Sequence, residues 1–167
     1  MKKPTPRKRT VKPDQMKPVL KALLDLKSDH GWYEQFQTAR DYMLFLLFSG
    51  CRAKETVTLK LEHIDIKSRT FKLEDPKTEP VELPLNDVLL SIAQRRLKAG
   101  DDYLFAGSDG TAPMTTPPKH TLAAVVKASG VAFTAHDLRL TFRTNADRVD
   151  IGMKTCAMLV NNKINSG

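Results

Sequence analysis

The sequence predicts a mainly α-helical domain with one small antiparallel β-sheet. Helical periodicity recurs along most of the chain, and residues 42–48 are apolar on every side, which is typical of a helix buried all round. Two short stretches of strand-forming residues, joined by a segment rich in turn formers, supply the sheet. With 167 residues, the chain is long enough for one domain with a proper core and too short for two ordinary ones.

The first half of the chain should form three helices. An amphipathic pattern begins at Pro13 and ends around residues 28–31, and a second helix follows over residues 32–49, the apolar part of which should form the centre of the core. Gly50 ends that helix. A short third helix is expected to carry Arg52, Glu55, Leu59 and Leu61.

A β-hairpin should follow. Residues 70–73 and 81–85 have strand character, and the linker between them, residues 74–80, contains two prolines and an acidic turn sequence. The hairpin therefore places Lys77 near its tip.

Helical periodicity returns in the second half of the chain. A helix is expected over residues 87–97, and a loop rich in Gly, Pro and Thr runs as far as Pro118. Further helices are expected at about residues 119–129, 136–149 and 153–160. No internal repeat is present.

The net charge of +8 is concentrated at the two ends of the chain. Residues 1–12 carry +6 and no acid, residues 13–110 carry −2, and residues 111–167 carry +4. A segment such as 1–12 cannot bury apolar surface and should stay mobile, as a basic arm or an interdomain linker. The alternative is a solubilising tail, because charge alone does not identify a nucleic acid as the partner.

Cysteine content and hydropathy favour a soluble, cytoplasmic protein. Cys51 and Cys156 lie far apart and follow no metal-ligand spacing, so neither a disulfide framework nor a zinc site is indicated. The sequence contains no N-terminal apolar region of a signal peptide, and its longest apolar run, residues 42–48, is far shorter than the ~20 residues needed to span a bilayer.

Arg52 is the first candidate for an anion-binding residue. It comes two residues after the glycine that ends a buried helix, so rigid structure should position its guanidinium, which can engage two phosphate oxygens at once. The alternative is a surface arginine paired with Glu55, which lies three residues away on the same helical face.

His136 and Arg139 form a second candidate pair. The spacing HxxR near a helix start places an imidazole and a guanidinium on one face, close to backbone amides that also favour anions. The alternative is a capping or surface histidine beside a salt-bridged arginine. The stronger indication is the joint occurrence of two arginines on separate helices, a histidine and a hairpin lysine.

These segments resemble the catalytic domain of a tyrosine recombinase of the phage integrase type, over nearly all of residues 13–167. Residues 49–55, SGCRAKE, resemble the first arginine box of that family. Lys77-Thr78 leading to Pro84-Leu85 resembles its lysine hairpin, and residues 134–142, TAHDLRLTF, resemble its second box. Three boxes in the family's order make the resemblance specific, and it implies the family's catalytic-core fold.

The resemblance implies a role for each of five residues. Arg52 and Arg139 would clamp the nonbridging oxygens of the scissile phosphate, where negative charge increases in the transition state. Lys77 would protonate the departing 5′ oxygen, and His136 would assist proton transfer or hold the phosphate. Glu55 would orient its neighbours. No metal or other cofactor is expected, since the guanidinium pair supplies the positive charge.

Asn162 is a first departure from the family pattern. It stands where the family usually has histidine or tryptophan, and asparagine can donate a hydrogen bond to a phosphate but cannot be cationic. Its function is expected to be weaker, or its role to have moved elsewhere. The alternative is a polar residue that merely ends a helix.

The nucleophilic tyrosine is the second departure. The family places it several residues beyond the position of Asn162, but the chain ends at Gly167, and Tyr33, Tyr42 and Tyr103 all precede the second box. The expectation is therefore a catalytic domain truncated at its C-terminus, with residues 1–12 as the basic linker from an upstream domain. Such a fragment should bind DNA without nicking it.

The function expected from the resemblance is site-specific DNA recombination through a 3′-phosphotyrosine intermediate, which integrates or excises a viral genome or another mobile element. Double-stranded DNA is the expected partner, and a homotetramer on DNA is expected of the full-length protein. Two alternatives stay open: a type IB topoisomerase-like enzyme, and a noncatalytic DNA-binding protein on the same fold.

Overall fold

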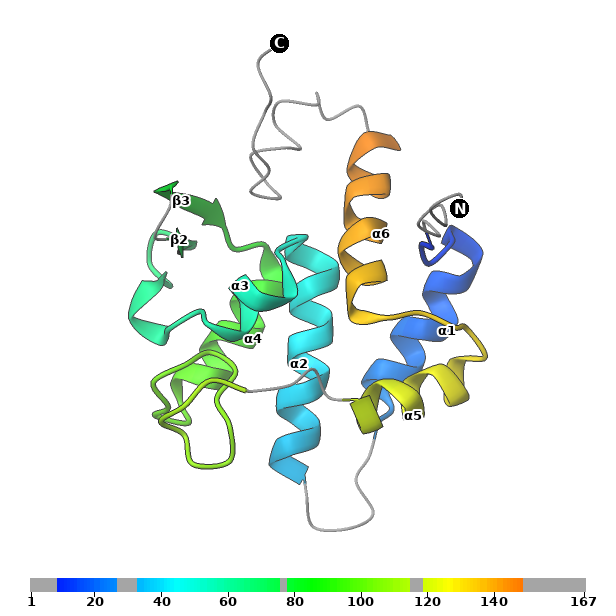
Figure 1. Ribbon diagram of the computed structural model, residues 1–167, viewed down its shortest axis with the longest axis horizontal. Helices are drawn as coiled ribbons and strands as arrows, with labels where there is room; N and C mark the ends of the chain where they lie inside the picture. Colours follow the sequence, from blue (N-terminus) through cyan, green and yellow to red (C-terminus); the bar gives the residue numbers. More distant parts are fainter. Residues whose placement is uncertain (1–8, 27–32, 76–77, 115–118, 149–167) are drawn as a thin grey trace, which may run out of the picture.

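The computed structural model describes residues 9–26, 33–75, 78–114 and 119–148 (Figure 1). Their helices are α1 (Pro13–Leu24), α2 (Tyr33–Ser49), α3 (Ala53–Val57), the 3₁₀ helix η1 (Leu61–His63), α4 (Asp87–Leu97), α5 (Lys119–Ser129) and α6 (Ala135–Arg148). Their strands are β1 (Ile64–Asp65), β2 (Thr70–Asp75) and β3 (Thr78–Pro84). Within these ranges, no helix has the length and apolar character needed to cross a membrane.

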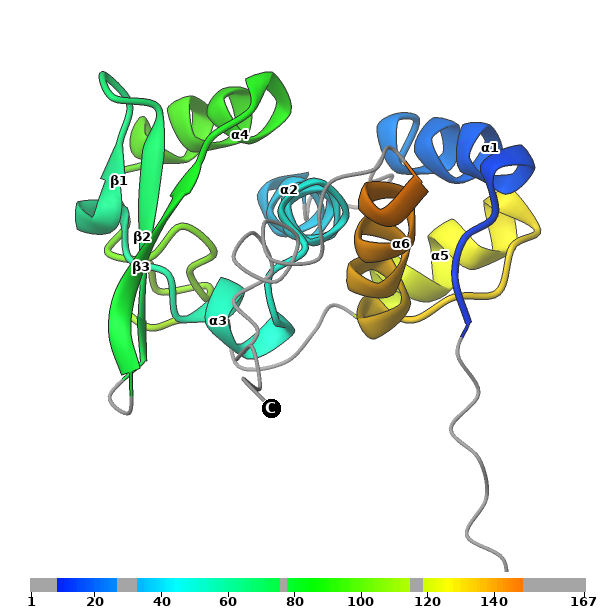
Figure 2. The ribbon, with the colours of Figure 1, turned by 90° about the horizontal axis from the view of Figure 1, so that it is seen from above.

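Helix α2 is the centre of the fold. It lies between the sheet and α4 on one side and α1, α5 and α6 on the other (Figure 2). All of residues 41–47 are buried, so the prediction of a helix buried all round is confirmed. Its C-terminal end, next to Gly50, carries the first arginine box.

Aromatic contacts hold the sheet side of the core against α2. The ring of Phe45 packs edge-on against Phe71 of β2, with centroids 5.4 Å apart, and against Phe105, at 5.6 Å. Tyr42 makes a third such contact with Phe105, also at 5.6 Å. Edge-to-face pairs add about 0.5–1.5 kcal/mol each beyond the area that they bury. Strand β2 and the loop after α4 are thereby held on α2.

Helix α4 is fixed to α2 by polar contacts. The carboxylate of Asp41, fully buried in α2, accepts hydrogen bonds from Arg95 at 3.0 Å and from Arg96 at 2.9 Å. At the start of α4, Asn86 caps the helix by accepting from the amide of Leu89 at 3.0 Å, and its Nδ2 donates to the carbonyl oxygen of Phe48 at 3.1 Å. These contacts hold the C-terminal half of α2 in place.

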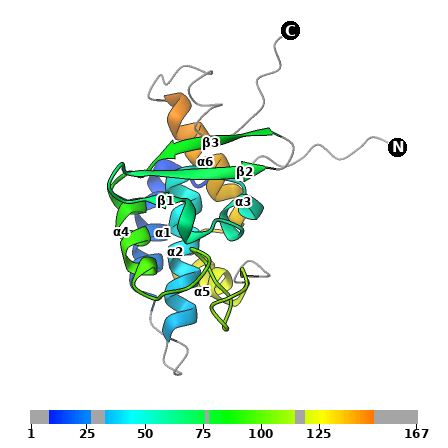
Figure 3. The ribbon, with the colours of Figure 1, turned by 90° about the vertical axis from the view of Figure 1, so that its left-hand side faces the viewer.

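The sheet has the order β1-β2-β3 and is antiparallel throughout (Figure 3). In the hairpin, Phe71 pairs with Leu83 and Leu73 pairs with Val81, with an irregularity between Leu73 and Asp75. The predicted hairpin is confirmed. Strand β1 was not predicted, because two residues are too short for a periodic pattern to be recognised.

Two of the predicted helices are shorter in the structure. Helix α1 ends at Leu24 instead of residues 28–31, and the amide of Asp25 closes it by donating to the carbonyl oxygen of Lys21 at 2.9 Å. Helix α3 does not include Arg52, Leu59 or Leu61.

The reasons lie at the two ends of α3. Arg52 is its N-cap, in extended conformation, and the hydroxyl of Thr58 donates to the carbonyl oxygen of Lys54 at 3.0 Å where the helix stops. Leu61 belongs to η1 instead. The helix predicted over residues 153–160 lies outside the described residues.

The segment before α1 differs from the expected mobile arm in its last part. Val11 is only 3% exposed and belongs to the core. Its amide donates to the hydroxyl of Thr141 at 2.9 Å, and that hydroxyl donates to the carbonyl oxygen of Asp137 at 2.7 Å. The chain at Val11 is therefore bound to α6 by a main-chain hydrogen bond, and the side chain of Val11 is buried in the core. Residues 1–8 lie outside the described part of the chain.

Candidate functional site

Arg52 is positioned by the backbone that follows α2. Gly50 has φ +66°, a left-handed conformation that glycine adopts without strain, and it turns the chain into α3. The amide of Arg52 donates to Oε2 of Glu55 at 2.7 Å, and its Nη1 donates to Oε1 of the same carboxylate at 2.5 Å. The Arg52 side chain is nevertheless 47% exposed. Glu55 thus orients the guanidinium while leaving part of it accessible to a ligand.

The second box starts helix α6. Thr134 is its N-cap: its amide donates to Oδ2 of Asp137 at 2.8 Å, and its hydroxyl accepts from the amide of Asp137 at 3.3 Å. This reciprocal cap fixes the first turn of the helix. His136 lies exposed in that turn, and Arg139 is buried at its end, 6% exposed.

Arg139 joins the two boxes. Its Nη1 donates to the carbonyl oxygen of Gly50 at 2.5 Å, across 89 residues of sequence. The pKa of Arg139 is lowered, first by burial and next by the positive charge of Arg52, whereas Glu55 opposes the shift. The two guanidiniums are therefore close enough to repel one another. An anion between them would relieve that repulsion, as a phosphate does.

Cys51 lies between these groups but adds no charge. Its side chain is buried, and burial is the main cause that raises its pKa to about 12. The thiol is therefore protonated at neutral pH and is not a nucleophile.

Of the predicted catalytic residues, Arg52, Lys77, His136, Arg139 and Asn162, the structure brings together Arg52 and Arg139. His136 shares the first turns of α6 with Arg139, three residues away, and faces solvent. Lys77 and Asn162 lie outside the described residues, although the strands on both sides of Lys77 are present.

The structure bears on the alternative interpretations of Arg52, His136 and Arg139. The pairing of Arg52 with Glu55 does occur, but it leaves much of the guanidinium exposed. His136 is not the helix cap, since Thr134 and Asp137 take that role, and Arg139 is buried instead of lying at the surface.

Two features of the site were not predicted. The spacing of Thr134 and Asp137 is that of a capping box with aspartate in the last position, and this signal could have been recognised. The role of the Gly50 carbonyl oxygen could not have been predicted. Every residue has a main-chain carbonyl, and only the folded structure brings this one to Arg139.

The structure describes the side chains of two tyrosines, Tyr42 and Tyr103. Tyr42 is fully buried, as predicted for a core residue, and burial raises its pKa to about 12. Tyr103 lines a pocket of about 480 Å³. The side chain of Tyr33 lies outside the described atoms.

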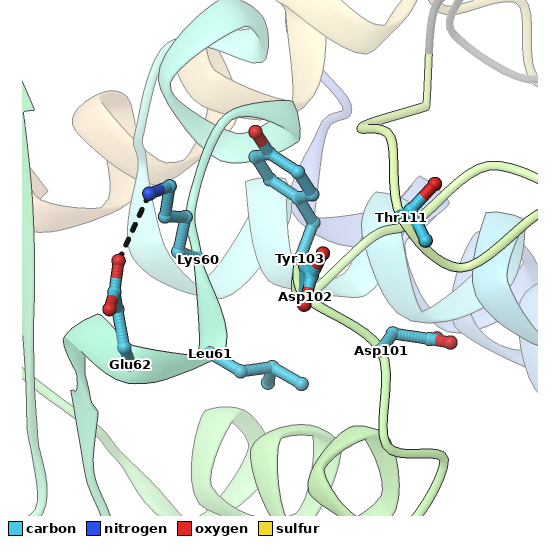
Figure 4. Close-up of a pocket in the computed structure, with 7 residues that line it drawn as sticks. All are labelled: Lys60, Leu61, Glu62, Asp101, Asp102, Tyr103 and Thr111. Atoms are coloured by element: carbon cyan, nitrogen blue, oxygen red, sulfur yellow. Dashed lines mark hydrogen bonds and ion pairs between the residues drawn. The ribbon is translucent and has the colours of Figure 1, made fainter.

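The pocket beside Tyr103 is unsuited to DNA. Figure 4 shows the side chains that line it: Lys60, Leu61, Glu62, Asp101, Asp102, Tyr103 and Thr111. Three are carboxylates, and the one cation, Lys60, is bound to Glu62 at 3.0 Å. Such a surface repels phosphate. In the described ranges, no group of three or more His, Cys, Asp and Glu side chains has an arrangement that could hold a metal ion.

Known structures share this fold. The Tn1549 transposon integrase in complex with transposon right end DNA superposes with a TM-score of 0.80 at 20% identity, covering 98% of this chain and 61% of that one. The XerH site-specific recombinase bound to its difH substrate gives 0.77 at 14% identity, over 93% of this chain and 47% of that one. The lambda integrase dimer bound to a core site gives 0.71 at 19% identity, over 98% and 61%.

These similarities confirm the predicted fold, a mainly helical catalytic core of the tyrosine recombinase type with a small antiparallel sheet. The chain spans between about half and three fifths of the length of these three structures. No curated protein sequence matches it significantly. The profile of the phage integrase family, in contrast, matches residues 9–161. Since that match covers nearly the whole sequence, the chain belongs to the phage integrase family.

Proposed function

We propose that the chain is the catalytic domain of a site-specific recombinase that cuts and rejoins double-stranded DNA through a 3′-phosphotyrosine intermediate. The observation that supports this most is the hydrogen bond from Arg139 to the carbonyl oxygen of Gly50, which holds the guanidinium of the second box against the backbone of the first, where the charge of Arg52 acts on it. Membership of the phage integrase family supports the same class of reaction.

The arginine pair suits the charge change of the reaction. When an oxygen attacks the phosphodiester, negative charge grows on the nonbridging oxygens, and donors already in position stabilise it without rearranging. Arg139 is buried, where electrostatic interactions are stronger than in water, and Arg52 is partly exposed toward an incoming ligand. Amides in the first turn of α6, beside His136, add partial positive charge.

The remaining roles belong to His136 and to residues outside the described part of the chain. A tyrosine oxygen would attack the phosphorus, the bond to the 5′ oxygen would break, and Lys77 would give that oxygen a proton. His136 would assist proton transfer or hold the phosphate, and Asn162 would donate one hydrogen bond to it. Tyr42 is buried and Tyr103 lines a pocket with three carboxylates, so we propose neither of them as the nucleophile.

The proposed partner is double-stranded DNA, and the proposed assembly is a homotetramer that holds two duplexes. The three neighbouring structures named above were all determined with DNA or a DNA site bound, which supports the first part. The mass of the parent protein on its recombination site, measured by light scattering, would test the second.

A covalent-trapping experiment tests the proposed reaction. The parent protein, expressed from its full reading frame, is mixed with a nicked duplex carrying its recombination site, and protein joined to the 3′ end is detected after denaturation. We expect wild-type protein to form this adduct and Arg139→Ala to form almost none. Arg148→Ala is the control, because Arg148 is exposed at the far end of the same helix.

Other outcomes would assign the chain differently. DNA binding with no adduct from the wild-type parent would favour the noncatalytic DNA-binding protein. Relaxation of supercoiled DNA without strand exchange would favour a type IB topoisomerase-like enzyme.

A further inference from the structure

A third arginine, Arg143, lies one turn of α6 beyond Arg139. We propose that Arg143 contacts the phosphate backbone of DNA beside Arg139, so that three arginines, and not two, bind the DNA at this site. The inference rests on the proposed function, since it requires that Arg52 and Arg139 bind DNA.

The helix geometry directs Arg143 toward the site. Residues four apart on a helix are neighbours on one face, and side chains of a helix incline toward its N-terminus. The side chain of Arg143 therefore extends back over the turn that holds Arg139, and it is partly buried there. Its charge also acts on Arg139, because Arg143 is one of the groups that lower the pKa of that guanidinium.

The charge of Arg143 is unpaired within the described part of the chain. Within residues 9–26, 33–75, 78–114 and 119–148, neither a hydrogen bond nor an ion pair joins its guanidinium to another group. Another partly buried arginine of the fold, Arg40, is paired with Asp41 at 3.3 Å, as is the buried Arg96 at 2.9 Å.

Neither Glu55 nor Asp147, which lies one turn beyond Arg143 on α6, forms an ion pair with Arg143 in the described part of the chain. Glu55 already binds Arg52, at 2.5 Å. Two cations four residues apart on a helix destabilise it unless an anion lies between or beside them. The proposed function itself brings DNA to this place, and we assign to Arg143 the phosphate next to the one shared by Arg52 and Arg139, as the anion that its guanidinium binds.

The salt dependence of DNA affinity measures this contact. Each neutralised phosphate contributes about 0.9 to the slope of log K against log salt concentration. For the 167-residue chain and a duplex oligonucleotide, we expect Arg143→Met to lower the magnitude of the slope by about 0.9. Methionine keeps most of the aliphatic stem and removes the charge. Arg143→Lys should keep the slope, and Arg148→Met, the matched control on the exposed end of α6, should leave it unchanged.

This experiment separates a failure of the inference about Arg143 from a failure of the proposed function. If the double variant Arg52→Met/Arg139→Met lowers the slope and Arg143→Met does not, the inference about Arg143 is wrong and the proposed function stands. If neither the double variant nor Arg143→Met changes the slope, the proposed function is wrong as well. A lower thermal midpoint of Arg143→Met with an unchanged slope would show a structural role only, and overturn the inference. Should Arg143→Met fail to fold, Arg143→Gln provides the same comparison.

Discussion

The guanidinium of Arg139 donates a hydrogen bond to the main-chain carbonyl oxygen of Gly50, at 2.5 Å. The direction of that carbonyl depends on the left-handed backbone of Gly50, with φ +66°. The backbone of the first arginine box therefore positions the side chain of the second. A substitution at Gly50 should act on Arg139 although it changes no charged group.

Gly50→Ala should lower both stability and DNA affinity. A Cβ at a left-handed position costs about 1–2 kcal/mol, and relief of that strain would turn the carbonyl away from Arg139. Gly130→Ala is the matched control, because Gly130 has φ +69° with open space around it and belongs to neither arginine box. We expect urea denaturation to show a similar loss for both variants, and duplex binding to weaken only for Gly50→Ala. Equal affinity of the two variants would argue against the positioning role.

Arg139→Ala should separate cleavage from binding in the parent protein. Removing a donor used in the transition state costs about 10²–10³-fold in rate or more, whereas one lost phosphate contact weakens DNA binding by only about tenfold or less. The measurements are single-turnover cleavage and a binding isotherm at one salt concentration. Wild-type cleavage by this variant would remove Arg139 from the site.

Lys77→Ala tests the proposed general acid in the parent protein. If Lys77 protonates the 5′ oxygen, a substrate whose 5′ leaving group needs no proton should restore cleavage by the variant. The same substrate should not rescue Arg139→Ala, which loses charge stabilisation instead. Absence of rescue for Lys77→Ala would indicate that the lysine only binds DNA.

Asp41→Ala should destabilise the fold strongly. Breaking a buried charge pair by removing one partner typically costs about 3–5 kcal/mol, and here Arg96 would be left buried without its carboxylate. Asp87→Ala, whose carboxylate is exposed and paired with Arg69, should leave the free energy of unfolding nearly unchanged. Both are measured by urea denaturation. A similar small effect of the two would mean that the Asp41 cluster does not hold α4 on α2.

Stability should fall at high pH, partly through Cys51. Burial raises the pKa of its thiol from 9.0 to about 12, so the folded chain keeps a proton that the unfolded chain releases between these values. The stabilisation is present below pH 9 and is lost as the pH rises toward 12. We expect Cys51→Ala to show a shallower decline between pH 9 and 11 than wild type. Identical declines would contradict this, since Tyr42 would then account for the whole effect.

Local patterns were sufficient to predict much of the fold. The bounds of α4 and α5 agree with the structure because helical periodicity and the cap at Asn86 are encoded in adjacent residues. The hairpin followed from its turn chemistry, and the buried character of α2 from its unbroken apolar run.

Contacts between distant residues were not predictable in the same way. The burial of Val11 and its bond to Thr141 join positions 130 residues apart, and the partner of Arg139 is a main-chain atom. Helix α3 was expected to be longer because Leu59 and Leu61 suit a helix, but the structure uses them in the loop and η1. Arg52 and Arg139 became candidate site residues through their sequence context and the resemblance to the phage integrase family, and their proximity came from the structure.

The most direct test is a crystal structure of the chain bound to duplex DNA. We expect the oxygens of a single phosphate to lie about 2.7–2.9 Å from guanidinium nitrogens of both Arg52 and Arg139. If the two arginines contact different phosphates, or if the DNA lies on another face of the protein, the proposal of one shared phosphate site is wrong.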